Sequence, residues 1–147
     1  MLRGLLRRWL KGDEEPAADG VEQLIADGHA HHLRGELEQA ARYYEIALTR
    51  APDHADAHYL MGGLCGQSNR LNAAVAHLKR ATELRPQFAA AHSDLATAYR
   101  LRGQLNEAVA SYRAAARLAP EDFSAQLGLA MTLGHLGRYA EDRKSVV

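Results

Sequence analysis

The chain has 147 residues, the size of a single domain. Its 18 lysines and arginines balance 18 aspartates and glutamates, so no overall field attracts nucleic acid or an acidic substrate. The single cysteine excludes an intramolecular disulfide, which fits a reducing compartment, and no apolar run approaches the roughly 18 residues that would span a bilayer. We therefore expect a cytoplasmic protein.

The first element in chain order is a basic amphipathic helix over residues 1–12. Its apolar side chains recur at the spacing of one helical face: Leu2, Leu5, Leu6, Trp9 and Leu10. The basic residues are Arg3, Arg7, Arg8 and Lys11. They interrupt the apolar stretch and no small-residue cleavage site follows, so the segment does not read as a signal peptide. Two interpretations stay open: a capping or frayed end of the domain, or a surface helix that contacts an anionic membrane or a partner.

Residues 13–20 are acidic and contain proline and glycine, which predicts a linker. Beyond the linker the sequence repeats every 34 residues, and three prolines mark the period: Pro52, Pro86 and Pro120. The period divides the region 21–141 into units 21–54, 55–88 and 89–122 and a partial unit 123–141. A period of this length indicates a stack of similar units rather than one enzyme core.

Each unit is predicted to hold two helices. In the third unit they cover residues 89–101 and 105–118. A glycine or asparagine stands between the helices of every unit, at Gly35, Asn69, Gly103 and Gly137. These residue types adopt the left-handed conformation that ends a helix at little cost. The prolines are expected to end each second helix, because proline lacks an N–H and restricts the residue before it.

Alanine keeps the same period in two columns: Ala40, Ala74 and Ala108, and Ala47, Ala81 and Ala115. We expect these residues where the two helices of a unit cross, because a larger side chain would hold the helices apart. Larger apolar residues such as Tyr44, Leu78 and Tyr112 would fill the space between units. No unit can bury its apolar face alone, so neighbouring units must stack.

This pattern resembles that of tetratricopeptide repeats. The third unit carries it most fully, with Leu95, Ala96, Tyr99, Ala108, Tyr112, Ala115 and Pro120. The second unit has Cys65 and Leu78 where aromatic residues are usual, and the first departs at Asp27 and His31. The resemblance implies an all-α, right-handed superhelix of helix–turn–helix repeats. It also implies a non-enzymatic scaffold that binds a peptide or a partner helix on its concave face.

The resemblance further implies that positions 2, 5, 9, 12 and 13 of each first helix line the concave groove. The predicted groove residues are Ile25, His29, His32, Asp56, Tyr59, Gln67, Ser93, Thr97, Arg100, Leu127 and Met131. These residues are mixed in character and lack the lysine and arginine cluster that holds a terminal carboxylate in chaperone-binding members. We therefore expect a protein or peptide partner and no nucleic acid.

No catalytic residue, cofactor or metal site is predicted. His54 and His58 are four residues apart, a spacing that can place two imidazoles on one helical face, but no cysteine or suitably placed glutamate accompanies them. His58 and His92 share position 4 of successive units, which indicates repeat-core or groove residues. Cys65 is expected to be a buried, inert thiol.

The fourth unit breaks the pattern, because residues 142–147 read DRKSVV where a second helix should follow. The nucleotide string that begins a widely used sequencing adapter encodes these six residues. Our hypothesis is that the natural gene continues, that residues 142–147 are adapter read-through, and that the chain is an N-terminal fragment of a longer bacterial protein. An uncapped apolar end at this position predicts self-association.

Two other functions stay open. Residues 91–96 and 103–108 resemble repeats that precede the catalytic half of bacterial O-linked N-acetylglucosamine transferases, so the chain would be the substrate-recognition region of a larger transferase. The asparagine ladder of that family runs along position 6, which holds Ala26, Leu60, Asp94 and Gly128 here. The missing catalytic domain could equally be a sulfotransferase or a methyltransferase. A membrane-peripheral assembly factor anchored by residues 1–12 is the third possibility.

Overall fold

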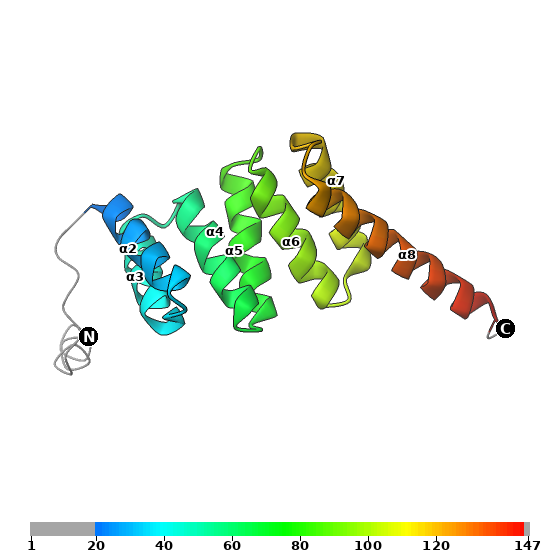
Figure 1. Cartoon of the computed structure of the whole chain (residues 1–147), viewed down its shortest axis with the longest axis horizontal. Helices are drawn as coiled ribbons and strands as arrows, with labels where there is room; N and C mark the ends of the chain where they lie inside the picture. The colour runs from blue at the N-terminus through cyan, green and yellow to red at the C-terminus, as the bar shows by residue number, and fades with distance from the viewer. Residues whose placement is uncertain (1–19, 146–147) are drawn as a thin grey trace.

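The protein is a row of paired α-helices, seen in a computed structural model that describes residues 20–145 (Figure 1). All regular secondary structure in this part of the chain is helical. The elements are α2 (Val21–Leu33), α3 (Leu37–Arg50), α4 (Ala55–Gln67), α5 (Leu71–Leu84), α6 (Ala89–Leu101), α7 (Leu105–Leu118) and α8 (Phe123–Ser145). The expected all-α stack of helical hairpins is confirmed. The predicted helix over residues 1–12 lies outside the described residues, as does the linker before Gly20.

The turn inside each hairpin ends the first helix in the same way three times. Gly35, Asn69 and Gly103 have φ angles of +78°, +55° and +76°. At each turn the N–H of this residue donates to the carbonyl three residues earlier, and the next N–H reaches the carbonyl five residues earlier, as from Gln104 to Tyr99 at 2.9 Å. These two bonds form a Schellman motif, which satisfies the last carbonyls of a helix. The predicted left-handed turns at these three positions are confirmed.

The turn between hairpins begins at the three prolines. The residue before each proline is extended, with φ between −133° and −135°, because the proline ring disfavours helical backbone there. The side chain at position 4 of the next helix forms a hydrogen bond that stabilises the same loop. His58, His92 and Gln126 bond through Nε2 to the proline carbonyl at 2.8, 2.9 and 2.6 Å. His58 and His92 therefore stabilise the loop, which corrects their assignment to the repeat core or the groove.

The alanine columns lie where helices meet. Ala40, Ala74, Ala108, Ala47, Ala81 and Ala115 are all at most 1% exposed. The large residues that follow the first column by one turn, Tyr44, Leu78 and Tyr112, are also buried. Burial of apolar surface contributes about 25 cal/mol per Å², and each helix from α2 to α8 contacts the next. The stack is therefore stabilised along its whole length by the positions that the sequence period predicts.

Glycine allows the closest approach between the helices of a hairpin. A Cβ atom on Gly28 would lie 2.7 Å from a ring carbon of Tyr44, and a Cβ on Gly62 would lie 2.6 Å from Cγ of Leu78. Atoms in folded proteins do not pack at these distances, so only hydrogen fits at either position. Gly63, the next residue along α4, faces open space instead.

The fourth unit differs from the prediction at Gly137. This residue does not end a helix, because α8 continues through it as one helix to Ser145. Beyond Thr132, every described side chain of α8 is exposed or half-buried. No packing there offsets the cost of interrupting the helix, which gains one hydrogen bond for each added residue. Residues 142–145 continue α8, and the origin of residues 142–147 stays a prediction.

Gly62→Ala and Gly63→Ala test the close approach at adjacent positions of α4. Alanine is favoured over glycine inside a helix by about 1 kcal/mol, so Gly63→Ala should raise the free energy of unfolding by about that amount. Gly62→Ala forces a methyl group into Leu78, and overpacking costs roughly 1–3 kcal/mol, so this variant should be less stable than the parent. Urea unfolding followed by circular dichroism measures both. Equal stabilisation by the two substitutions would contradict the packing described.

Candidate peptide-binding groove

A groove crosses the first helices of three successive units, α2, α4 and α6. It consists of two adjoining hollows, one of about 460 Å³ between α2 and α4 and one of about 380 Å³ bounded by α4, α5 and α6. The two hollows share Gly63, Gln67 and Asp94. Consecutive first helices contact one another directly, which keeps the groove continuous. The remaining lining residues are His29, His32, Leu33, Tyr59, Leu60, Gly62, Gly66, Leu71, Ala74, Leu78, Thr97, Ala98 and Leu101.

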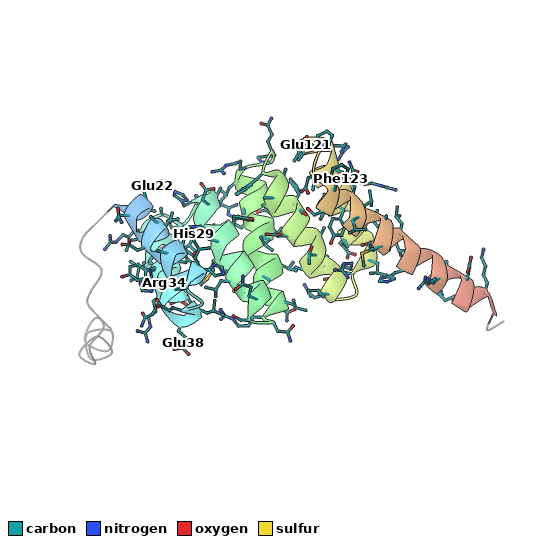
Figure 2. The ribbon with its side chains drawn as sticks, viewed as in Figure 1. Glu22, His29, Arg34, Glu38, Glu121 and Phe123 are labelled. Atoms are coloured by element: carbon teal, nitrogen blue, oxygen red, sulfur yellow. The ribbon has the colours of Figure 1, made fainter. Side chains whose placement is uncertain are left out.

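The half of the groove between α2 and α4 is bridged by a polar contact. His32 Nε2 lies 3.0 Å from Gln67 Oε1, so the imidazole donates to the amide oxygen and joins the two helices. His32 Nδ1 lies 3.5 Å from the hydroxyl of Tyr44 on α3. Burial raises the pKa of Tyr44 to about 12, so its hydroxyl keeps its proton and faces the imidazole as the donor. His29, labelled on α2 in Figure 2, is the exposed histidine of this half.

Asp94 is the acidic residue at the junction of the two hollows. Its carboxylate interacts with the hydroxyl of Tyr59. Burial raises the pKa of Asp94, and the interaction with Tyr59 opposes that rise. The pKa of Tyr59 is raised to about 12, first by burial and then by the nearby charge of Asp94. No lysine or arginine lines either hollow. The groove therefore combines apolar surface with several polar groups and one acidic residue, and no lysine or arginine lines it beside that residue.

A stack of side chains supports Tyr59 from the loop before α6. Its ring centroid lies 4.7 Å from that of Phe88, and the guanidinium of Arg85 lies 4.7 Å from the Phe88 ring centroid. Arg85 in turn forms two hydrogen bonds with the carboxylate of Asp56, at 2.9 and 2.7 Å. These bonds lower the pKa of Asp56. The stack restricts the rotamer of Tyr59, which reduces the entropy that a ligand contact with this ring would cost.

Thr97 is also held in one orientation. Its hydroxyl donates to the carbonyl of Ser93 at 3.1 Å, and the hydroxyl of Tyr112 lies 2.9 Å from the same oxygen. Because the threonine proton is already used, Tyr112 is the donor in the second contact. The hydroxyl of Thr97 therefore has no proton left to donate to a ligand at the α6 wall.

The structure brings together some of the predicted groove residues and separates others. His29, His32, Tyr59, Gln67 and Thr97 line the hollows. Ile25 does not, and this prediction is corrected: its side chain is only 8% exposed and packs in a core cluster with Leu24, Ala47 and Ala57. Ala47 lies on α3 and Ala57 on α4, so Ile25 belongs to the hydrophobic core between α2 and these two helices.

Five further predicted residues lie outside the two hollows. The carboxylate of Asp56 is bonded to Arg85, and the backbone carbonyl of Ser93 accepts from Thr97. Arg100 is half-buried and its Nε has no hydrogen-bond partner, as is also true of Oε1 of Gln104. Leu127 and Met131 are exposed on one face of α8 together with Phe123, which Figure 2 shows at the start of that helix. They extend the exposed apolar surface along α8.

Asp94 lines the groove at a position that sequence reasoning did not select, whereas Leu33 and Leu101 line it at position 13, which sequence reasoning did select. Leu33 and Leu101 occupy position 13 of their units, and they are 76% and 57% exposed although apolar. Asp94 stands at position 6, which was considered only for an asparagine ladder. Asp94 could have been identified from the sequence as a carboxylate on the groove-lining face of a predicted helix with no lysine or arginine near it on that face.

His54 and His58, which the sequence places four residues apart, have separate partners in the structure. His54 precedes α4 as its N-cap and accepts from the N–H of Ala57, while its other ring nitrogen lies 2.9 Å from Glu22. His58 lies inside the helix, so His54 and His58 do not share a helical face. Within the described residues no three histidine, cysteine, aspartate or glutamate side chains gather to hold an ion. Cys65 is buried as expected, and burial raises the pKa of its thiol.

Two tetratricopeptide family models match the sequence. One, described as a tetratricopeptide repeat, covers residues 32–98, and the other, described as a TPR repeat, covers residues 96–137. The chain belongs to the tetratricopeptide repeat family. No curated protein matches its sequence.

No helix among residues 20–145 is both long enough and apolar enough to cross a membrane.

Solved structures of tetratricopeptide proteins resemble the chain over most of its length. The first TPR domain of Spaghetti (RPAP3), bound to the HSP90 peptide SRMEEVD, has a TM-score of 0.78 at 19% identity and covers 80% of this chain and 93% of its own. MamA has a TM-score of 0.78 at 20% identity, with 97% and 78% covered. A mutant O-GlcNAc transferase of Thermobaculum terrenum is 28% identical with a TM-score of 0.72, and the match covers 77% of this chain but 22% of the transferase. The first two similarities establish the fold alone.

The contact between His58 and His77 should make stability depend on pH. Their Nδ1 atoms lie 3.0 Å apart, and the His58 Nε2 proton is committed to the Pro52 carbonyl, so His77 is the donor. Burial, then the nearby charges of His58 and Arg70, hold the pKa of His77 below its ordinary value of 6.5. The unfolded chain binds more protons in that range, so the free energy of unfolding should decrease as pH falls through 6.5.

His77→Gln should flatten this pH dependence, because glutamine can still donate to His58 and does not titrate. Urea unfolding of the parent and the variant, across the pH range from 5 to 8 that histidine governs, measures the difference. His135→Gln, on the exposed surface of α8, is the control for loss of a histidine. Parallel pH profiles for the parent and His77→Gln would show that the pair does not contribute.

Proposed function

We propose that the chain is a non-enzymatic interaction scaffold that binds an extended peptide or a partner helix in the groove across α2, α4 and α6. The observation that carries this proposal is the pair of adjoining hollows, whose walls combine exposed leucines with polar side chains and a single acidic group, Asp94, at their junction. Binding sites for peptides typically combine an apolar surface with a few positioned polar groups. The helices that form the walls are held by a buried core, so the groove exists before a ligand arrives.

The charge of the groove favours a ligand that carries a cation between apolar residues. Leu33, Leu60 and Leu101 supply apolar contact, and no lining lysine or arginine competes for Asp94. A lysine or arginine beside Asp94 would favour its ionised form and offset its desolvation. An acidic ligand such as SRMEEVD, which the RPAP3 domain binds, would instead leave Asp94 beside further negative charge. The preferred partner therefore differs in charge from that peptide.

Peptide display on the full chain tests this specificity. Selection should enrich sequences with lysine or arginine among large apolar residues, and acidic sequences should be depleted. A hydrogen bond to a charged group contributes about 1.5–3 kcal/mol, so Asp94→Asn should weaken the selected peptide, measured by fluorescence anisotropy. Tyr59→Ala should weaken it as well, because it removes both the ring contact and the support of Asp94.

The matched control is Glu121→Gln. It removes one acidic charge at the turn before α8, where Figure 2 shows Glu121 beside Phe123 and apart from His29. This variant should bind the selected peptide like the parent. Equal affinity of Asp94→Asn and Glu121→Gln would place the binding site elsewhere on the chain.

A second candidate is the substrate-recognition region of a larger transferase. The 28% identity to the Thermobaculum terrenum O-GlcNAc transferase, over a match covering 22% of that protein, favours it. Position 6 counts against the glycosyltransferase version, since it holds Ala26, Leu60, Asp94 and Gly128 rather than asparagine. The nucleotide sequence of the natural gene beyond the codon for Glu141 is the test. A catalytic domain encoded there would support this candidate, and a natural stop codon would remove it.

A further inference from the structure

The chain carries a segment of its own whose chemistry complements the groove. Residues 1–12 contain four basic side chains and five large apolar ones at the spacing of one helical face. The groove offers exposed leucines and the carboxylate of Asp94, and no lysine or arginine lines it to repel a cation. Charge and apolar character therefore match between the segment and the groove.

The covalent connection places this segment within reach. Residues 13–20 link it to α2, which is itself one wall of the groove. Eight extended residues span at most about 26–29 Å. His29, at the near hollow, lies nine residues beyond Gly20, which corresponds to roughly 14 Å along the helix. The linker is therefore longer than the path that it must cover.

The lengths of the two surfaces also agree. Twelve residues in a helix extend about 18 Å. Packed helices lie about 8–10 Å apart, so the distance from α2 across α4 to α6 is about 16–20 Å. Residues 1–12 laid across the three walls would therefore be long enough to span both hollows, with a basic side chain within reach of Asp94 at their junction.

We propose that residues 1–12 occupy the concave groove of their own chain and compete with external peptides. This proposal rests on the proposed peptide-binding function of the groove. A short flexible linker gives an effective concentration in the millimolar range. If the segment alone binds with a dissociation constant of about 100 μM, it fills most grooves and weakens an external ligand by about tenfold. The groove would then respond only to partners that bind more strongly than the chain's own segment.

Trp9, the only tryptophan of the chain, reports the occupied state directly. In the full chain its emission should be blue-shifted and shielded from acrylamide, to the same degree at 0.5 and 50 μM protein (about the working range of the method). Asp94→Asn should red-shift the emission and increase quenching, and Glu121→Gln should leave both unchanged. A Trp9 that is fully quenched in the parent overturns the proposal.

Varying the protein concentration and adding anionic vesicles show which surface shields Trp9 from acrylamide. Shielding that grows with protein concentration would assign the segment to a second copy of the chain. Shielding that requires anionic vesicles would assign it to a membrane surface. Either result overturns occupation within the same chain.

Charge reversal in the full chain separates this proposal from the function of the groove. Arg7→Glu combined with Arg8→Glu should release the segment and strengthen binding of the display-selected peptide by about tenfold, as the competition above predicts. If the peptide binds the parent and this variant equally, the groove is functional but its own segment does not occupy it. If the peptide binds neither chain and Trp9 is exposed, both proposals fail.

Discussion

The fold depends on the close contact between the two helices of each hairpin. Gly28 lies against Tyr44 and Gly62 against Leu78, with room for hydrogen only at the glycine. The small residue lets the backbones approach, and the large residue of the opposite helix fills the space beside it. Close packing of this kind determines the crossing of the helices, because interiors tolerate neither voids nor overlaps. Repetition of one crossing every 34 residues then produces a regular stack.

The groove is a consequence of that stack. The small faces of the first helices are buried against the second helices, so their opposite faces line a shared surface. Side chains on this surface do not support the crossing and are free to differ between units, which is why His29, Gly63 and Thr97 stand at the same position 9. Where a groove residue is held in place, the support comes from the loops and second helices, as Phe88 supports Tyr59.

Most of the fold was predictable because its determinants are local and repeated. A left-handed residue ends a helix whatever surrounds it, and a proline ends one for reasons within its own backbone. Gly137 shows the limit of this reasoning. Glycine permits a turn but does not require one, and without a helix packed against the end of α8 the helix continues. Ile25 shows a second limit: its position in the repeat was known, but its burial depends on how α3 and α4 pack against α2.

The sequence by itself determined the helix boundaries, the turn residues and the buried columns of the first three units, because these follow from periodicity and backbone chemistry. Only the tertiary structure decided which polar groups meet. The pairing of Tyr59 with Asp94 and the bridge from His32 to Gln67 join residues of different units. Their contact depends on how one hairpin is rotated against the next, and that rotation is set by the packing of all the side chains between them.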